Sequence, residues 1–160
     1  MRLAKIPLFC AAAHIVAVCG TLLFLRSHLM WILWMIAAVS LIAFYAWWSV
    51  RIGKFAPVVI ASAGLVCDLT GESLFIFRPE LDRAASLLTG GAANGLYTIC
   101  GILLTLATPS VPLRWLAWIA WASGIVLIIV TIFNSRIGVM IATAALMASF
   151  IPFVIAMARE

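Results

Sequence analysis

Single basic residues separate long apolar runs along almost the whole chain. Six runs stand between charged residues, and each holds at least about 20 residues, the length that a helix needs to cross a hydrocarbon core of about 30 Å. The fourth run predicts a helix that starts near Ala85 and stops before "TPSVP", whose prolines break it. The charged residues that bracket the six runs are Lys5 and Arg26, Arg26 and Arg51, Lys54 and Arg78, Arg83 and Arg114, Arg114 and Arg136, and Arg136 and Arg159. The pattern predicts an all-α integral membrane protein with six transmembrane helices, formed by residues 1–160 as one domain.

Composition supports this prediction and excludes one class of partner. Hydrophobic residues make up 67% of the chain and charged residues 9%, and the mean hydropathy is +1.26, whereas a soluble domain carries about a quarter charged residues. The net charge is +5, but the basic residues occur singly and form no basic stripe, so we expect no nucleic-acid partner. We expect them instead to touch the anionic head groups of membrane lipids. The four cysteines have no metal-ligand spacing, and we expect free thiols, no metal and no cofactor.

The distribution of charge between loops indicates an orientation. With the N-terminus inside, six basic residues are cytoplasmic and four are outside, a small bias that favours both termini inside. The six are Arg2, Lys5, Arg51, Lys54, Arg114 and Arg159, and the four are Arg26, Arg78, Arg83 and Arg136. Short loops and little soluble chain are typical of a bacterial inner membrane protein. Homo-oligomerisation is left open.

Three short matches indicate an internal repeat. "CGTLLF" at 19–24 matches "CGILLT" at 100–105, "WILW" at 31–34 matches "WIAW" at 118–121, and "SVRIG" at 49–53 matches "NSRIG" at 134–138. The matches occur in the same order at nearly equal spacing, which predicts a tandem three-helix repeat with halves of about 1–78 and 82–160. A repeated unit with an odd number of spans enters the membrane the opposite way the second time. The repeat therefore has inverted topology, with a site expected near the midplane.

Two carboxylates interrupt the third apolar run, in "GLVCDLTGESLF" at residues 64–75. Asp68 and Glu72 are four residues apart and therefore lie on one helix face. A carboxylate that faced lipid would cost several kcal/mol, so we expect both to face the interior of the bundle. Two carboxylates this close do not both ionise in a low dielectric, and we expect one to hold a proton near neutral pH. The alternative is that the pair only holds helices together by hydrogen bonds.

The fourth and neighbouring helices supply candidate partners for these acids. Counting inward from "RPELDR" puts Asn94 at the depth of Glu72 and Tyr97 at the depth of Asp68, so an amide and a phenol are expected to bind the carboxyls. Gly91 and Gly95 form a GxxxG pair, which predicts a close approach by another helix. His14 aligns through the repeat beside Asn94, and Trp121 is deeper than the other tryptophans. We add both to the candidate site, with a packing role for His14 as an equal alternative.

One stretch has a family resemblance. "GLVCDLTGESL", followed by a helix that carries "NGLY", is similar to the paired acid and tyrosine helices of the lysoplasmalogenase membrane family. The resemblance is confined to these segments, the motif residues differ, and that family is expected to have more spans. The resemblance therefore does not assign the chain to that family.

Three functions fit these features. The first is a proton- or cation-linked transporter or channel for a small solute, which Asp68, Glu72, Asn94 and Tyr97 would bind. The second is a membrane-embedded isomerase, cyclase or hydrolase of a lipid or isoprenoid substrate, with Asp68 and Glu72 as catalytic acid and base. The third is an accessory subunit of a membrane complex. Motifs for phosphate loops, zinc hydrolases and serine hydrolases are absent from the sequence.

Overall fold

The computed structural model describes residues 4–24 and 27–159, which contain helices and no strand. Six helical segments are long and apolar enough to cross a membrane, in agreement with the sequence pattern. Arg2 and Arg26, used above for orientation, lie outside the described residues. The elements are α1 (Lys5–Leu23), α2 (His28–Ile52), α3 (Ala56–Phe77), η1 (Pro79–Leu81), α4 (Asp82–Ser86), η2 (Leu87–Ala93), α5 (Asn94–Ala107), α6 (Arg114–Ile132) and α7 (Arg136–Met157).

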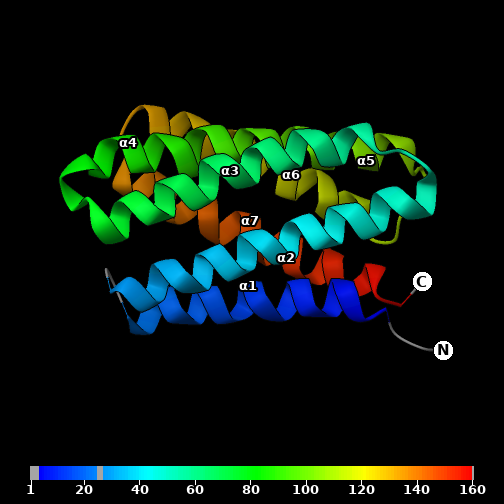
Figure 1. Ribbon diagram of the computed structural model, residues 1–160. Coiled ribbons are helices and arrows are strands. Elements are labelled where there is room, and N and C mark those ends of the chain that lie inside the picture. Colours follow the sequence, from blue (N-terminus) through cyan, green and yellow to red (C-terminus); the bar gives the residue numbers. More distant parts are fainter. Residues whose placement is uncertain (1–3, 25–26, 160) are drawn as a thin grey trace.

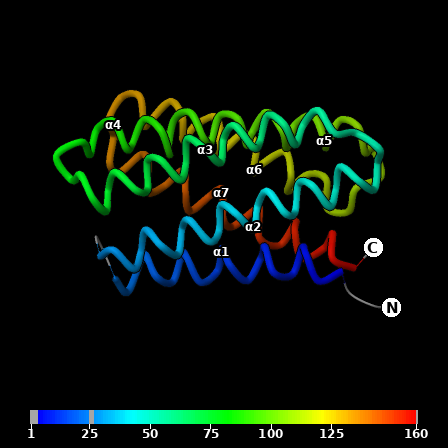
Figure 2. Tube along the Cα trace, viewed as in Figure 1, coloured from blue at the N-terminus to red at the C-terminus, as the bar shows by residue number. Residues whose placement is uncertain are grey.

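The helices run along one common axis and contact one another in chain order (Figure 1). Each spanning helix packs against the one before it, and α1 also packs against α7, so the bundle closes. The backbone N–H of Ala4 donates to the carbonyl oxygen of Ala158 at 2.8 Å, which ties the two ends of the chain together (Figure 2). We call this end of the bundle, where α1 starts and α7 stops, the terminal end. The opposite end, where α3 stops and α7 starts, is the distal end.

Helix boundaries follow local sequence signals. Ser27 and Ser135 accept hydrogen bonds from the backbone of α2 and α7, as N-caps do. Gly53 ends α2 with φ of 66°, a left-handed conformation that glycine adopts without a steric cost. The fourth span starts earlier than Ala85, because it begins at Pro79 directly after α3. A proline is accepted at the first position of a helix, where its missing N–H has no partner to lose.

Arg83 connects the start of the fourth span to the end of α6. Its guanidinium donates to the carbonyl oxygens of Thr131 and Ile132, each at 2.7 Å. These carbonyls belong to the last turn of α6 and have no partner within their own helix. A positive charge at a helix C-terminus is also favourable electrostatically. The contact therefore fixes the position of α4 against α6 at the distal end.

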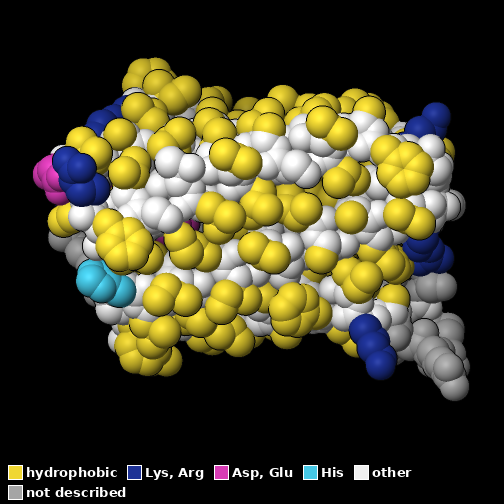
Figure 3. Space-filling model, viewed as in Figure 1, with side chains coloured by type: hydrophobic (Ala, Val, Ile, Leu, Met, Phe, Trp, Pro, Cys, Tyr) yellow, Lys and Arg dark blue, Asp and Glu magenta, His cyan; other side chains and the backbone are white. Residues whose placement is uncertain are grey.

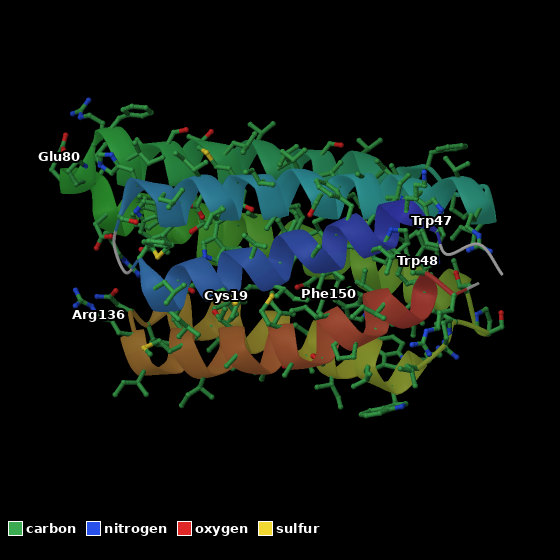
Figure 4. All side chains as sticks on the ribbon, turned by 90° about the horizontal axis from the view of Figure 1, so that it is seen from below. Cys19, Trp47, Trp48, Glu80, Arg136 and Phe150 are labelled. Atoms are coloured by element: carbon green, nitrogen blue, oxygen red, sulfur yellow. The ribbon has the colours of Figure 1, made fainter. Side chains whose placement is uncertain are left out.

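Large aromatic side chains fill the terminal half of the interior. They interlock at centroid separations such as 5.6 Å between Trp48 and Phe153 and 6.3 Å between Trp121 and Phe153. No member is more than 3% exposed. Figure 4 shows Trp48 toward the terminal end and Glu80 and Arg136 at the distal end. We call this group the aromatic cluster: Phe44, Tyr45, Trp48, Trp121, Phe150 and Phe153.

The buried residues of the distal half are mostly small or polar. Close helix contacts there are made at glycines: a Cβ on Gly90 would lie 2.7 Å from the hydroxyl oxygen of Thr131, and one on Gly71 would lie 2.5 Å from a methyl group of Thr89. The buried set on this side includes Ala17, Gly20, Ala37, Ala38, Gly71, Glu72, Ala93, Thr131 and Ala142. The two halves of the bundle are therefore packed with different kinds of side chain: large aromatic ones in the terminal half and small or polar ones in the distal half.

The outer surface has the polarity that a bilayer requires. Large apolar side chains cover the sides of the bundle, and the Lys, Arg, Asp and Glu side chains visible at the surface gather near its two ends (Figure 3). Among the exposed apolar side chains are Val59, Val66 and Ile141, with exposed fractions of 70%, 66% and 64%. Soluble monomers rarely expose contiguous apolar patches beyond a few hundred Å². The six apolar helices and this surface together fit a membrane-spanning bundle.

The first two sequence matches occupy comparable places in the fold. The indole N–H of Trp34 on α2 donates to the Thr21 hydroxyl on α1 at 2.9 Å. The indole N–H of Trp121 on α6 donates to the Thr105 hydroxyl on α5, also at 2.9 Å. The third match differs, because "SVRIG" ends α2 whereas "NSRIG" precedes and begins α7. The three-helix repeat therefore stays a prediction.

Candidate functional site

Asp68 occupies the middle of α3 and is bound by a tyrosine. At about 1.5 Å per residue it lies roughly 18 Å from the start of α3 and roughly 14 Å from its end. The phenol of Tyr97 on α5 donates to Asp68 Oδ2 at 3.1 Å. The carboxyl therefore lies near the middle of the span and points toward α5.

A glycine on α3 makes room for this tyrosine. A Cβ on Gly64 would lie 2.9 Å from Tyr97 Cε1 and 3.2 Å from the carbonyl oxygen of Ala93, too close for a real side chain. Helical side chains point toward the N-terminus of their own helix. The Tyr97 ring therefore crosses Gly64, one turn before Asp68 on α3, and its hydroxyl extends to Asp68. The other end of the same residue is also held, since the Tyr45 hydroxyl donates to the Tyr97 carbonyl oxygen at 3.0 Å.

Glu72 lies one turn nearer the distal end and is the least satisfied group of the site. Its side chain is only 6% exposed. Its Oε2 atom is buried and has no hydrogen-bond partner among the described residues. A buried polar group without a partner costs about 1–3 kcal/mol, and an ionised one costs more. Such a group either holds a proton or accepts a donor that comes from outside the protein.

The structure does not pair Asn94 with Glu72. The Asn94 side-chain amide donates instead to the carbonyl oxygen of Thr89 at 2.8 Å, within the same span. That carbonyl lies in η2, a π-helical segment, and it also accepts the backbone N–H of Asn94, five residues later. The same depth estimate places Tyr97 at Asp68, as the structure does, and differs only for Asn94. The fourth span follows α3 through the short η1 turn, so Gly71, beside Glu72, packs against Ala85 and Thr89.

The expected GxxxG contact is also absent at its two glycines. A Cβ on Gly91 would have no atom within 4 Å, and one on Gly95 would make an ordinary contact of 3.6 Å with Ile128. Close approach to α6 occurs instead at Gly90 and, on α6 itself, at Gly124. The π-helical segment shifts the face that this span presents to its neighbours, which the regular spacing of the sequence did not reveal.

His14 and Trp121 lie apart from the two acids. His14 is buried on α1, where its Nδ1 lies 2.8 Å from the Cys10 carbonyl oxygen and its ring meets Phe150 edge-on at 5.2 Å. Trp121 belongs to the aromatic cluster, and its N–H is committed to Thr105. The described residues contain no group of three or more His, Cys, Asp or Glu side chains that could hold a metal ion.

An aromatic pair that the sequence analysis did not include stands next to Glu72. Trp31 of α2 stacks on Phe75 of α3 with ring centroids 4.1 Å apart and an interplanar angle of 9°. Phe75 is three residues beyond Glu72, so the two project from the same helix face in successive turns. That spacing was visible in the sequence. Nothing in the sequence indicated that Trp31 would be the partner of Phe75.

A shallow hollow on the outer face of α3 does not involve the acids. Its volume is about 460 Å³, and it lies on the side of the helix opposite Asp68 and Glu72. Its lining residues are Leu69, Thr70, Ser73, Leu74, Phe77 and Arg78. The candidate site therefore comprises Asp68, Glu72 and Tyr97, with Trp31 and Phe75 beside it.

The comparisons with known proteins found no counterpart: no family model, no curated protein and no solved structure matches this chain.

Proposed function

We propose that the protein is an integral membrane protein with both termini on the cytoplasmic side. Six apolar helices with an apolar outer surface support this proposal. Lys5, Arg51, Lys54 and Arg114 all lie near the terminal end, and excess Lys and Arg is typical of cytoplasmic loops. The described distal end carries Arg78, Arg83 and Arg136, together with the acids Glu80 and Asp82.

The activity we propose is proton- or cation-linked transport of a small solute. The observation that carries this proposal is the Glu72 carboxyl, which is buried without a partner one turn from Asp68. Ionisable residues inside a membrane are expensive and typically mark the path of an ion or substrate. Protons and cations would compete for the same two carboxyls, so binding one releases the other. That competition is the elementary step of exchange transport.

Uneven packing of the interior supports a path that is closed on one side. The aromatic cluster fills the terminal half, whereas small and polar residues line the distal half up to Asp68. We propose that a solute reaches the acids from the distal side, where the buried side chains are smaller. The predicted inverted repeat supplies a route to the opposite conformation, because halves related by a two-fold axis in the membrane plane can exchange their arrangements.

A membrane-embedded enzyme is the second candidate, favoured by one observation. The Tyr97–Asp68 hydrogen bond places a phenol and a carboxyl beside a second, unpartnered carboxyl. Two carboxyls in different environments can divide the roles of general acid and general base. A lipid or isoprenoid substrate would reach them from the bilayer. Conversion of an added lipid by the purified protein, with no ion flux, would favour this function over transport.

The test of transport uses the purified protein in sealed liposomes that contain a pH-sensitive dye. Gradients of Na⁺, K⁺ and phenethylammonium are applied in turn, and proton movement in the opposite direction is recorded. We expect exchange with at least one cation, and loss of that exchange when Asp68→Asn and Glu72→Gln are combined. Glu80→Gln is the matched control, because Glu80 is an exposed acid at the distal end. Flux that survives the double substitution, or a wild-type protein that moves none of the three cations, refutes the proposal.

A further inference from the structure

We infer that the solute of this site is a small organic cation, an ammonium group attached to a flat apolar body. The inference rests on the proposed function and specifies its substrate class. The ammonium would lie between Asp68 and Glu72, and the body would lie against the stacked rings of Trp31 and Phe75. Four features support this: the charge of the site, its need for hydrogen-bond donors, its aromatic neighbours and the filled interior on its terminal side.

The site carries two acids and no basic side chain of its own. Every described Lys and Arg lies at or near the end of a spanning helix, and the guanidinium of Arg83 is bound to the carbonyl oxygens of Thr131 and Ile132 on α6. Glu72 Oε2 lacks a donor, and Asp68 receives one hydrogen bond, from Tyr97. A carboxylate offers about four acceptor positions, so most of those at the site are unfilled. An ammonium group brings a positive charge and up to three N–H donors, which matches what both carboxyls lack.

Metal ions suit the site less well than an ammonium does. Calcium takes 6–8 oxygen ligands, and magnesium needs near-ideal octahedral geometry. The described residues supply two carboxyls here and no third His, Cys, Asp or Glu within reach of both. The Asn94 amide, which could have added an oxygen, is oriented by its bond to Thr89. The oxygen ligands around Glu72 are therefore too few for calcium or magnesium.

The aromatic pair supplies a surface for the rest of the molecule. Trp31 and Phe75 join α2 to α3 one turn from Glu72 toward the distal end, and both rings are only partly buried. Cations and flat apolar groups are attracted to the faces of Trp and Phe rings, with Trp the strongest. Trp34, one turn deeper on α2, is fixed by its bond to Thr21. The stacked rings of Trp31 and Phe75 therefore provide a flat aromatic surface one turn from Glu72.

The packing on the terminal side of the site determines how such a molecule would lie. That side is filled by the aromatic cluster, whose members are at most 3% exposed. A ligand that enters from the distal side passes Trp31 and Phe75 before its charged group meets Glu72. Its apolar body then stays next to the rings.

The experiment measures direct binding to the purified protein in detergent by isothermal titration calorimetry. The probes are phenethylammonium, methylammonium, which lacks the ring, and 2-phenylethanol, which lacks the charge. We expect phenethylammonium to bind at least about tenfold more tightly than either. Glu72→Gln should weaken its binding at least about tenfold. Phe75→Leu should weaken it about three- to tenfold and leave methylammonium unchanged. Trp118→Leu is the matched control, since Trp118 is a partly exposed ring on α6.

The outcomes separate this inference from the proposed function. Equal affinity for phenethylammonium and methylammonium, or binding that Phe75→Leu does not change, overturns the inference. If acid-dependent exchange of Na⁺ or K⁺ persists without phenethylammonium binding, transport stands and the substrate class is wrong. If phenethylammonium binds as expected but no cation crosses the liposome membrane, the ligand class stands and transport is wrong. If Phe75→Leu fails to fold, Trp31→Phe and Trp31→Leu replace it. Trp31→Phe retains a ring and should weaken phenethylammonium binding less than Trp31→Leu.

Discussion

Substituting Gly64 by alanine tests the contact that places Tyr97 on Asp68. The added Cβ would lie 2.9 Å and 3.0 Å from two atoms of the Tyr97 ring and 3.2 Å from the Ala93 carbonyl oxygen. The ring cannot retreat easily, because both the hydroxyl and the backbone carbonyl of Tyr97 are hydrogen-bonded. Overpacking of this kind costs about 1–3 kcal/mol. Alanine's better helix propensity returns up to about 1 kcal/mol. We therefore expect a net loss of up to about 2 kcal/mol, and a difference of about 1–3 kcal/mol from a variant that gains the same propensity without the overpacking.

The measurement is reversible unfolding of Gly64→Ala in mixed micelles of a mild detergent and sodium dodecyl sulfate, followed by circular dichroism. Gly91→Ala is the matched control, because nothing lies within 4 Å of a Cβ at that position. The control should be neutral or more stable by up to about 1 kcal/mol. If the two variants unfold at the same detergent fraction, α3 and α5 do not pack at Gly64 as described. The positioning of Asp68 by Tyr97 would then have no structural basis.

Three further predictions concern the ends, the packing and the orientation of the bundle. Arg83→Gln removes the charge that binds the last carbonyls of α6, so thermal unfolding in detergent should show a loss of about 0.5–1 kcal/mol, and an unchanged midpoint would contradict the capping role. Trp121→Phe leaves the buried Thr105 hydroxyl without its donor and should cost about 1–3 kcal/mol, whereas Trp115→Phe, at a ring that is 60% exposed, should change stability by less than about 0.5 kcal/mol. In a cysteine-free background, Lys54→Cys and Glu80→Cys should react with an impermeant maleimide from opposite faces of sealed vesicles, and labelling of both from one face would refute the membrane-spanning arrangement.

The six helices could be predicted from the sequence because each has the length and polarity of a segment that can cross a bilayer. A run of about 20 apolar residues between charges has few other stable structures. The start of the fourth span was less predictable. Pro79 is usually a helix breaker, and only its position at the first turn after Arg78 makes it acceptable. Sequence periodicity also assumes regular helices, so the π-helical segment at Leu87–Ala93 and its effect on the glycine faces were missed.

The candidate site was only partly predictable from the sequence. The shared face of Asp68 and Glu72 follows from their spacing, and the approach of Tyr97 follows from antiparallel pairing of α3 with the next span. The partners of Asn94, His14 and Trp121 depend on which helices become neighbours, and α1 lies next to α7 rather than α5. Contacts between side chains from different helices, such as the stacking of Trp31 on Phe75, have no signature within either segment.

The agreement between chain order and neighbour order in the bundle has a consequence for biosynthesis. Each spanning helix can dock on the one synthesised just before it, so most of the interface forms from segments close together in the sequence. The exception is the seam between α1 and α7, where His14 meets Phe150 and Ala4 binds Ala158. The flank of α1 that α7 covers therefore lacks its partner helix until α7 has been synthesised. During that interval the His14 ring keeps its bond to Cys10 on the same helix and lacks its contact with Phe150.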